Sequence, residues 1–237
     1  EKIDKWILCK TNEFVKKSDE YYSSYQVYKL MREATLLLDD LSNWYVRRNR
    51  RRFWKSENDS DKNAAYMTLY NALLTYIKVL APIIPFVTEE MYRNLVMNIN
   101  ESEQDSIHLN FFPRYNKSKT KEKLIIEIDN LINIVNLGRS ARSKSKIKVR
   151  QPLSAISIFS KDQDSIDSIL KNCDQIKEEL NVKSVKIVDR IDDILEYEIK
   201  PNFSNLRSRF GDEMNKSISE INKLDASMIA KSLGSDK

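Results

Sequence analysis

The chain has 237 residues, with three glycines, five prolines and a formal net charge of +5. So few turn-forming residues predict long helices, and this length can bury a core in one large domain or two. Its two cysteines, Cys9 and Cys173, are too far apart for a disulfide framework or a cysteine zinc cluster. No apolar run reaches the roughly 18 residues of a membrane span. The isolated cysteines fit a reducing, cytoplasmic environment. Because the chain begins inside a helical pattern, we expect a piece of a larger protein.

Positive charge is concentrated in two short segments. Residues 47–55 carry six Lys or Arg and residues 139–150 carry another six, and neither segment contains an acid. Of the 40 Lys and Arg, 28 remain for the rest of the chain, against 35 Asp and Glu. Two basic segments in a chain that is otherwise acidic predict a defined anionic partner rather than non-specific electrostatic binding.

The N-terminal segment predicts one helix opened by Asp4 and a second helix that begins with a serine cap at Ser23 or Ser24. Four tyrosines surround that cap. They could stack RNA bases, although tyrosines at such positions more often lie at the edge of a core. The apolar stripe of the first helix consists of Ile3, Trp6, Ile7, Phe14 and Tyr21.

The stretch from Leu41 to Trp54 continues the second helix into a run of arginines flanked by aromatics. At about 100° per residue, two faces separate. The predicted core face holds Leu30, Ala34, Leu37, Leu41, Trp44 and Tyr45. The other face is a candidate RNA-binding surface, because guanidinium groups fork onto phosphates or bases and aromatic rings stack on bases. Its residues are Asn43, Arg47, Arg50, Arg51 and Trp54.

Two alternatives stay open for this stretch. Its charged face could simply be solvated, with the two tryptophans packed beneath it. Arg48 and Arg52 fall on the core side, so they either pair with buried carboxylates or lie where the helix has frayed.

A third and a fourth helix complete a predicted bundle of antiparallel neighbours joined by short turns. The third helix ends before Pro82, and Pro85 lies in the first turn of the fourth. Glu89 and Glu90 are candidate ion-pair partners for the two core-side arginines. His108 has no partner set for a triad or a metal site, so we expect it to be structural. The stripe of the third helix is Ala65, Leu69, Ala72, Leu73, Tyr76, Ile77 and Leu80.

The periodicity changes after a further helix, which runs from about Thr120 to near Gly138. Strand-like segments follow, with one or two short helices between the first two of them. We therefore predict a mainly α fold in which a helical bundle precedes a small α/β module. The strands are expected at 155–159, 185–188 and 195–199, and the short helices within 163–180. The predicted domains are a bundle at 1–116, an α/β module opened by a long helix at 117–200, and a polar tail with a weak helix at 201–237.

The second basic segment is predicted to contact the RNA backbone while carrying little base information. The alternative is a solvated helix end that leads into a strand. Its candidate RNA-binding residues are Arg139, Arg142, Lys146, Lys148 and Arg150. The sequence has no glycine-rich phosphate loop, no Ser-His-Asp set and no His/Cys/Asp set at ligand spacing, so we assign no catalytic, metal-binding or cofactor-binding residue.

Several motifs follow one another along the chain, namely Asp4–Leu8, Ser42–Arg47, Arg50–Trp54, Leu80–Phe86, Thr88–Tyr92, Leu137–Arg139, Lys148–Leu153 and Lys200–Phe203. In this order they resemble the anticodon-binding region of isoleucyl-tRNA synthetases, which are class I enzymes. The resemblance covers nearly the whole chain. The Trp-Tyr pair followed by arginines, and the later Arg-Gln-Pro-Leu, favour the isoleucyl enzymes over the valyl, leucyl and methionyl enzymes.

The resemblance implies that this is a fragment of an isoleucine–tRNA ligase that binds the anticodon stem-loop of tRNA(Ile). An upstream catalytic domain of the same chain would use ATP to attach isoleucine, an editing domain would also lie upstream, and the fragment alone is expected to lack the attachment activity. Many bacterial members end in a cysteine zinc site. With two isolated cysteines, this chain is more similar to the eukaryote-like branch, and no zinc site is expected. The alternatives are the corresponding region of a valyl-type synthetase and a helical scaffold that docks an acidic protein.

Overall fold

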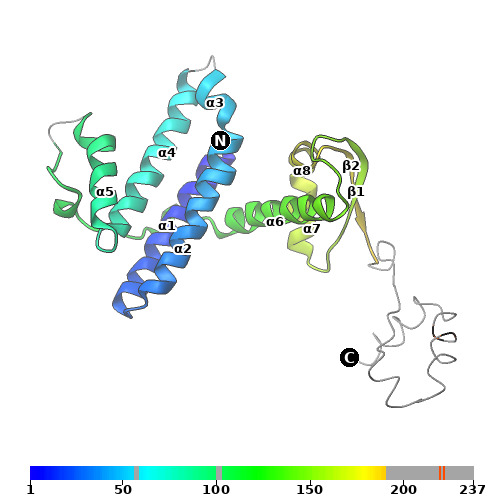
Figure 1. The fold of residues 1–237 in the computed structure, drawn as a ribbon, viewed down its shortest axis with the longest axis horizontal. Helices are drawn as coiled ribbons and strands as arrows, with labels where there is room; N and C mark the ends of the chain where they lie inside the picture. Colours follow the sequence, from blue (N-terminus) through cyan, green and yellow to red (C-terminus); the bar gives the residue numbers. More distant parts are fainter. Residues whose placement is uncertain (56–58, 100–102, 191–218, 220, 222–237) are drawn as a thin grey trace, which may run out of the picture. The chain divides into compact units, whose positions relative to one another are not determined.

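The computed structural model describes residues 1–55, 59–99, 103–190, 219 and 221. The chain divides into two compact units, Glu1–Ile132 and Asn133–Lys237. The first unit is helical and the second contains a small parallel sheet, which confirms the predicted fold class (Figure 1). The predicted domain boundary after residue 116 divides the chain differently and stays a prediction. Within the described part of the chain, none of the helices combines the length and apolar character that a membrane span needs.

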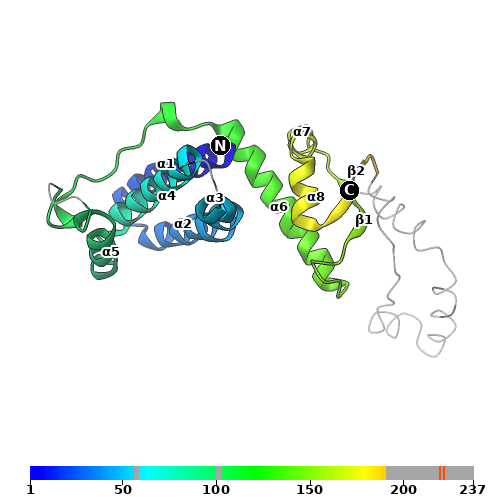
Figure 2. The same ribbon diagram turned by 90° about the horizontal axis from the view of Figure 1, so that it is seen from above.

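Three long helices form the body of the first unit. Helix α1 packs against both α2 and α4, and α3 packs against α4 (Figures 1 and 2). Short π-helical segments, named η1 and η2, continue α2 and α5. The bounds are α1 Lys2–Ser23, α2 Val27–Asp39, η1 Asp40–Val46, α3 Arg50–Lys55, α4 Asp59–Leu80, α5 Pro85–Tyr92 and η2 Arg93–Met97, followed by the 3-10 turns η3 Ile107–Leu109 and η4 Lys117–Lys119.

The core face predicted for the second helix is confirmed. All six of its residues are buried, and Trp44 and Tyr45 are only 4% and 0% exposed. These two neighbours lie in η1, where hydrogen bonds from residue i to i+5 add a residue to the turn. Helix α1 contributes Trp6, Ile7 and Phe14 to the same core.

The start of α1 and the start of α2 both differ from the prediction. Helix α1 begins at Lys2, and Asp4 is its third residue, where its carboxylate takes part in a capping box with Glu1. The predicted serine cap of α2 is wrong. The Ser24 hydroxyl donates to the carbonyl oxygen of Glu20, because a serine at a helix end can bond back to the preceding turn. Helix α2 begins only after Tyr25, which has a φ of 56°.

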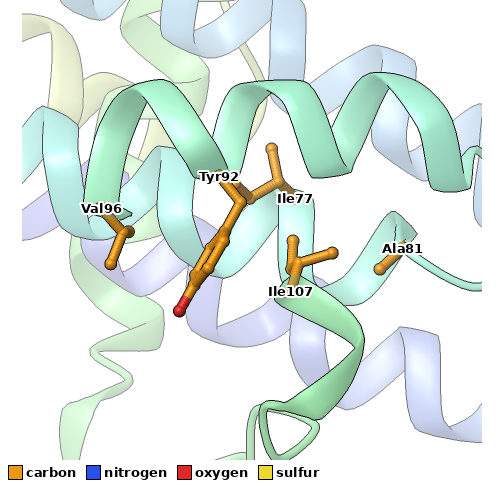
Figure 3. Packing of buried hydrophobic residues seen from close by; sticks show 5 residues of the cluster. All are labelled: Ile77, Ala81, Tyr92, Val96 and Ile107. Carbon is orange, nitrogen blue, oxygen red and sulfur yellow. The ribbon is translucent and has the colours of Figure 1, made fainter. Parts of the chain in front are cut away.

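The helical hairpin of α4 and α5 is confirmed at both prolines. Helix α4 ends at Leu80, two residues before Pro82, and Pro85 is the first residue of α5. A buried apolar cluster joins α4, α5, η2 and η3, and its tyrosine hydroxyl accepts a hydrogen bond from Asn110 Nδ2 at 3.1 Å. Figure 3 shows the cluster residues Ile77, Ala81, Tyr92, Val96 and Ile107.

The second unit confirms two of the predicted strands. Strands β1 and β2 run parallel with Ala155 opposite Ser184 and Phe159 opposite Val188, and two short helices connect them. The third predicted strand, at 195–199, lies outside the described residues, as does the tail apart from residues 219 and 221. The bounds are β1 Leu153–Phe159, α7 Gln163–Lys171, α8 Cys173–Leu180 and β2 Val182–Val188.

Helix α6, Glu122–Lys144, runs six residues beyond its predicted end near Gly138. Gly138 does not terminate the helix. A Cβ atom built on it would lie 2.5 Å from Leu180 Cδ1, so the glycine allows α6 and the end of α8 to approach closely. The helix ends instead at Lys144. Lys146, in the turn just beyond it, has a φ of 55°, and the amide of Ile147 bonds back to the carbonyl of Arg142.

Candidate nucleic-acid interface

Arg52 is buried between two carboxylates that come from different helices. Its Nη1 and Nη2 donate to the two carboxylate oxygens of Asp4, on α1, at 2.8 and 3.1 Å. Its Nε and Nη2 donate to the carboxylate of Asp61, on α4, at 2.9 and 2.6 Å. Forked bonds of this kind are the strongest that arginine makes with carboxylates. Arg52 therefore ties α3 to both α1 and α4.

Two further side chains complete what we call the Arg52 cluster, which consists of Arg52, Asp4, Asp61, Tyr45 and Asn49. The Tyr45 hydroxyl donates to Asp4 Oδ1 at 2.8 Å, and Asn49 Oδ1 accepts from Arg52 Nη1 at 3.1 Å. Burial alone would raise the pKa of Asp4, but its bonds to Arg52 and Tyr45 hold that pKa below its usual value. Burial raises the pKa of Tyr45, and the neighbouring Asp4 raises it further. Asp4 is thus ionised and Tyr45 neutral at pH 7.

The prediction that Arg52 pairs with a buried carboxylate is confirmed, but the predicted partners Glu89 and Glu90 are wrong. Glu89 instead accepts hydrogen bonds from Ser106 Oγ and the Ile107 amide, which fixes the connection after η2. These bonds hold its pKa below the usual value although burial acts in the opposite direction. The partners Asp4 and Asp61 lie 48 and 9 residues from Arg52 along the chain. Nothing in the local pattern links residues so far apart.

The five residues predicted to face RNA share exposure to solvent, and we call them the arginine face: Asn43, Arg47, Arg50, Arg51 and Trp54. Trp54 is 66% exposed, and the Arg50 guanidinium lies over its ring at 5.3 Å. Arg47 Nε donates to the carbonyl of Asn43 at 2.8 Å, and its guanidinium lies 5.4 Å from the ring of Trp44. The two tryptophans therefore have different environments. Trp44 packs in the core, whereas Trp54 lies on the surface with one arginine stacked on it.

Arg48 occupies the border between these two faces. It is half-buried, and its guanidinium lies over the ring of Trp44 at 5.3 Å. The segment from Asp40 to Lys55 is helical apart from a turn at Asn49, so the alternative of a frayed helix end does not hold there.

In the second basic segment, Arg142 is buried, which leaves its guanidinium little exposure for the predicted RNA contact. It is 4% exposed, and its guanidinium donates to four main-chain carbonyl oxygens. Nη1 bonds the carbonyls of Lys148 and Gln151 at 3.1 and 2.9 Å, and Nη2 bonds those of Leu180 and Asn181 at 2.6 and 3.1 Å. Arg142 therefore holds the turn after α6 against the end of α8. A charge run in sequence gave no sign that this one member points inward.

The other members of that segment lie at the surface to different degrees. Arg139 forms an ion pair of 2.5 Å with Glu179 on α8 and is half-buried. Lys146, Lys148 and Arg150 are exposed on the turn between α6 and β1. The structure thus brings these three together on one short turn, whereas Arg139 lies on the helix before it.

No metal-binding group emerges from the described part of the chain. His108 lies exposed in η3, and no group of three or more His, Cys, Asp or Glu side chains there is placed to hold a metal ion. A helical bundle that presents arginines and an aromatic ring from a segment anchored by buried ion pairs has the character of a nucleic-acid-binding domain.

The comparison with known families defines this domain further. Residues 4–157 match the model of the anticodon-binding domain of tRNA ligase, and the chain belongs to this family. The match covers the bundle from the third residue of α1 onward, including the arginine face and the Arg52 cluster, and extends through α6 into β1.

Individual relatives are isoleucine–tRNA ligases, which confirms the resemblance to isoleucyl enzymes. The chain is 40% identical over 99% of its length to the enzyme of Clostridium novyi, and 41% identical over 96% to that of Clostridium acetobutylicum. It is 38% identical over 96% to the enzyme of Treponema denticola. The chain spans 20–22% of the length of these relatives. The expected eukaryote-like branch is not tested by them and stays a prediction.

Proposed function

We propose that this chain holds the anticodon stem-loop of tRNA(Ile) within an isoleucine–tRNA ligase. An upstream catalytic domain of the same chain would use ATP to attach isoleucine to that tRNA in the cytoplasm, and an editing domain would also lie upstream. Family membership supports the binding of an anticodon, and the isoleucine–tRNA ligases among the relatives support the choice of isoleucine. In this arrangement the fragment contributes tRNA binding and no chemical step.

The observation that carries this proposal is the arginine face on an anchored helix. Arg47, Arg50 and Arg51 can fork onto phosphates or base edges, and Trp54 can stack on an unpaired base. The Arg52 cluster fixes α3 to two other helices from its buried side. Since the helix is held before RNA arrives, less conformational freedom is lost on binding.

The turn after α6 offers a second contact of a different kind. Lys146, Lys148 and Arg150 are exposed there and would neutralise RNA phosphates without reading bases. Arg139 already forms an ion pair with Glu179, so a phosphate would have to compete with that carboxylate. We therefore retain Arg139 as a minor contact and leave Arg142 out.

Binding of the 237-residue chain to tRNA(Ile), to the same tRNA with a swapped anticodon, and to an unrelated tRNA tests the proposal. Arg51→Ala should weaken the binding of tRNA(Ile) and reduce the preference of the chain for tRNA(Ile) over the tRNA with the swapped anticodon. Arg32→Ala, which removes an exposed arginine from α2, is the matched control and should change neither. Equal binding of all three tRNAs, or of an acidic protein in preference to them, would contradict the proposal and favour the scaffold alternative.

A further inference from the structure

A cavity of about 520 Å³ lies in the first unit between α1, α4 and the segment that leads into α6. Four cationic side chains line it, together with amide and hydroxyl groups, and no carboxylate of the described residues does. The cations are Lys5, Arg114, Lys119 and Lys121. We call this site the basic cavity. Its volume is within the range of small-molecule and cofactor sites.

Three other lysines of α1 differ from this grouping in their partners. Lys2, Lys10 and Lys17 each pair with a carboxylate, Lys10 with Asp40 and Asp129. Among the described residues, none of the four cations of the basic cavity has such a partner. Three lysines of α1 are therefore neutralised by carboxylates and Lys16 lies over the ring of Tyr115, whereas the four cations at the cavity are left uncompensated by the described carboxylates.

The wall that carries Lys119 and Lys121 is fixed to α1 by hydrogen bonds. Asn12 Nδ2 donates to the carbonyl of Asn116 and to Thr120 Oγ1 at 2.8 and 2.7 Å, and Asn12 Oδ1 accepts from the Asn116 amide at 3.1 Å. The thiol of Cys9 donates to the carbonyl of Lys119 at 3.1 Å. These bonds hold like charges at one cavity in the absence of a ligand. An anion bound there would relieve their mutual repulsion.

We propose that the basic cavity binds phosphate groups, supplied either by an RNA backbone or by a free oligophosphate. A phosphate offers several acceptor oxygens to the point charges of the lysines and to the forked guanidinium of Arg114. Four cations and this volume accommodate more than one phosphate. The RNA source rests on the proposed function, since a tRNA held at the arginine face could extend its backbone across the same unit. The phosphate chemistry itself does not depend on that function.

Tripolyphosphate is the first probe, titrated calorimetrically onto the wild-type chain and onto the double variant Lys5→Gln/Lys121→Gln. The matched control is Lys161→Gln/Lys171→Gln, which removes two exposed lysines of the second unit. We expect the cavity variant to bind tripolyphosphate at least tenfold more weakly than the control. Because the substituted lysines are exposed, the melting temperature should be unchanged or raised, which separates loss of binding from loss of folding.

The second arm measures tRNA affinity over a salt series. A backbone source predicts that the cavity variant flattens the slope of log affinity against log salt by about 1.4–1.8, for two lost phosphate contacts. If the cavity variant keeps the wild-type slope but loses tripolyphosphate binding, the ligand of the basic cavity is a free oligophosphate. If the wild type binds tripolyphosphate but no tRNA, the proposed function fails and the cavity assignment stands. Equal tripolyphosphate binding by both variants, or equally tight binding of poly-glutamate at the same cavity, would overturn it.

Discussion

In the first basic segment Arg52 is buried between two carboxylates, whereas in the second Arg142 is buried among four main-chain carbonyl oxygens. Both environments provide hydrogen-bond acceptors for a guanidinium that is removed from water, but only the carboxylates around Arg52 also neutralise its charge. Their reach also differs. Arg52 connects three helices, while Arg142 closes one turn against the end of α8. In each segment one arginine is buried and bonded to other parts of the protein, while other members remain exposed to solvent.

The largest effect should come from removing the arginine that is paired with carboxylates. Arg52→Met removes the guanidinium that Asp4 and Asp61 share, and losing one partner of a buried ion pair costs about 3–5 kcal/mol of unfolding free energy. Urea unfolding measures this cost. Arg51→Met, one residue earlier and exposed, is the control and should stay within about 0.5 kcal/mol of wild type. Equal costs for the two variants would show that the Arg52 cluster does not hold the bundle.

Removing the other buried arginine should cost less. Arg142→Met leaves carbonyl oxygens of the α6 turn and the α8 end without donors, and unsatisfied buried acceptors cost about 1–3 kcal/mol. Arg142→Lys sharpens the comparison, because it keeps the charge but cannot reach four carbonyls at once. We expect it to lose nearly as much stability in the same urea assay. Full stability of Arg142→Lys would mean that charge, rather than fork geometry, secures this turn.

Exposed arginines should affect binding without affecting stability. Arg51→Ala should weaken tRNA(Ile) binding by about 1–3 kcal/mol, the value of a forked contact to a base, and leave the melting temperature nearly unchanged. Trp54→Ala should lose a similar amount of tRNA binding free energy if the exposed Trp54 ring stacks on a base. Parallel melting and gel-shift measurements separate the two effects. A large fall in melting temperature for either variant would place that side chain in the core instead.

The smallest effect concerns how the free energy of unfolding depends on pH. Changing the surroundings of Arg52 should alter that dependence, whereas removing Arg142 should not. The folded-state pKa of Asp4 is lowered from 3.8, so its stabilising contribution is complete above the unfolded value and is lost as pH falls through the folded value. Unfolding free energies measured from neutral pH down to about pH 2 should therefore fall less steeply in Asp4→Asn than in wild type. The Arg142→Met variant should keep the wild-type slope, because carbonyl oxygens do not titrate in this range. Identical slopes for wild type and Asp4→Asn would contradict the assignment.

Several features of this protein follow from sequence alone, because they depend on neighbours along one helix. The spacing of Leu37, Leu41 and Trp44 places them on a common face, and the fixed backbone angle of proline sets the limits of α4 and α5. The same periodicity places Arg51 and Trp54 away from the core and Arg52 toward it. Two strands and the helices between them follow from the change in period after Pro152.

Tertiary structure alone decided which groups those side chains meet. Arg52 finds Asp4 across 48 residues, and Arg142 finds carbonyls 38 residues away, at distances that no local pattern encodes. Gly138 looked like a helix end until the packing of Leu180 against it gave a different reason for the missing side chain. The basic cavity likewise collects Lys5 with Lys121 only after α1 and the later segment fold together. Periodicity fixes the direction of a side chain, whereas its partner depends on how separate elements pack.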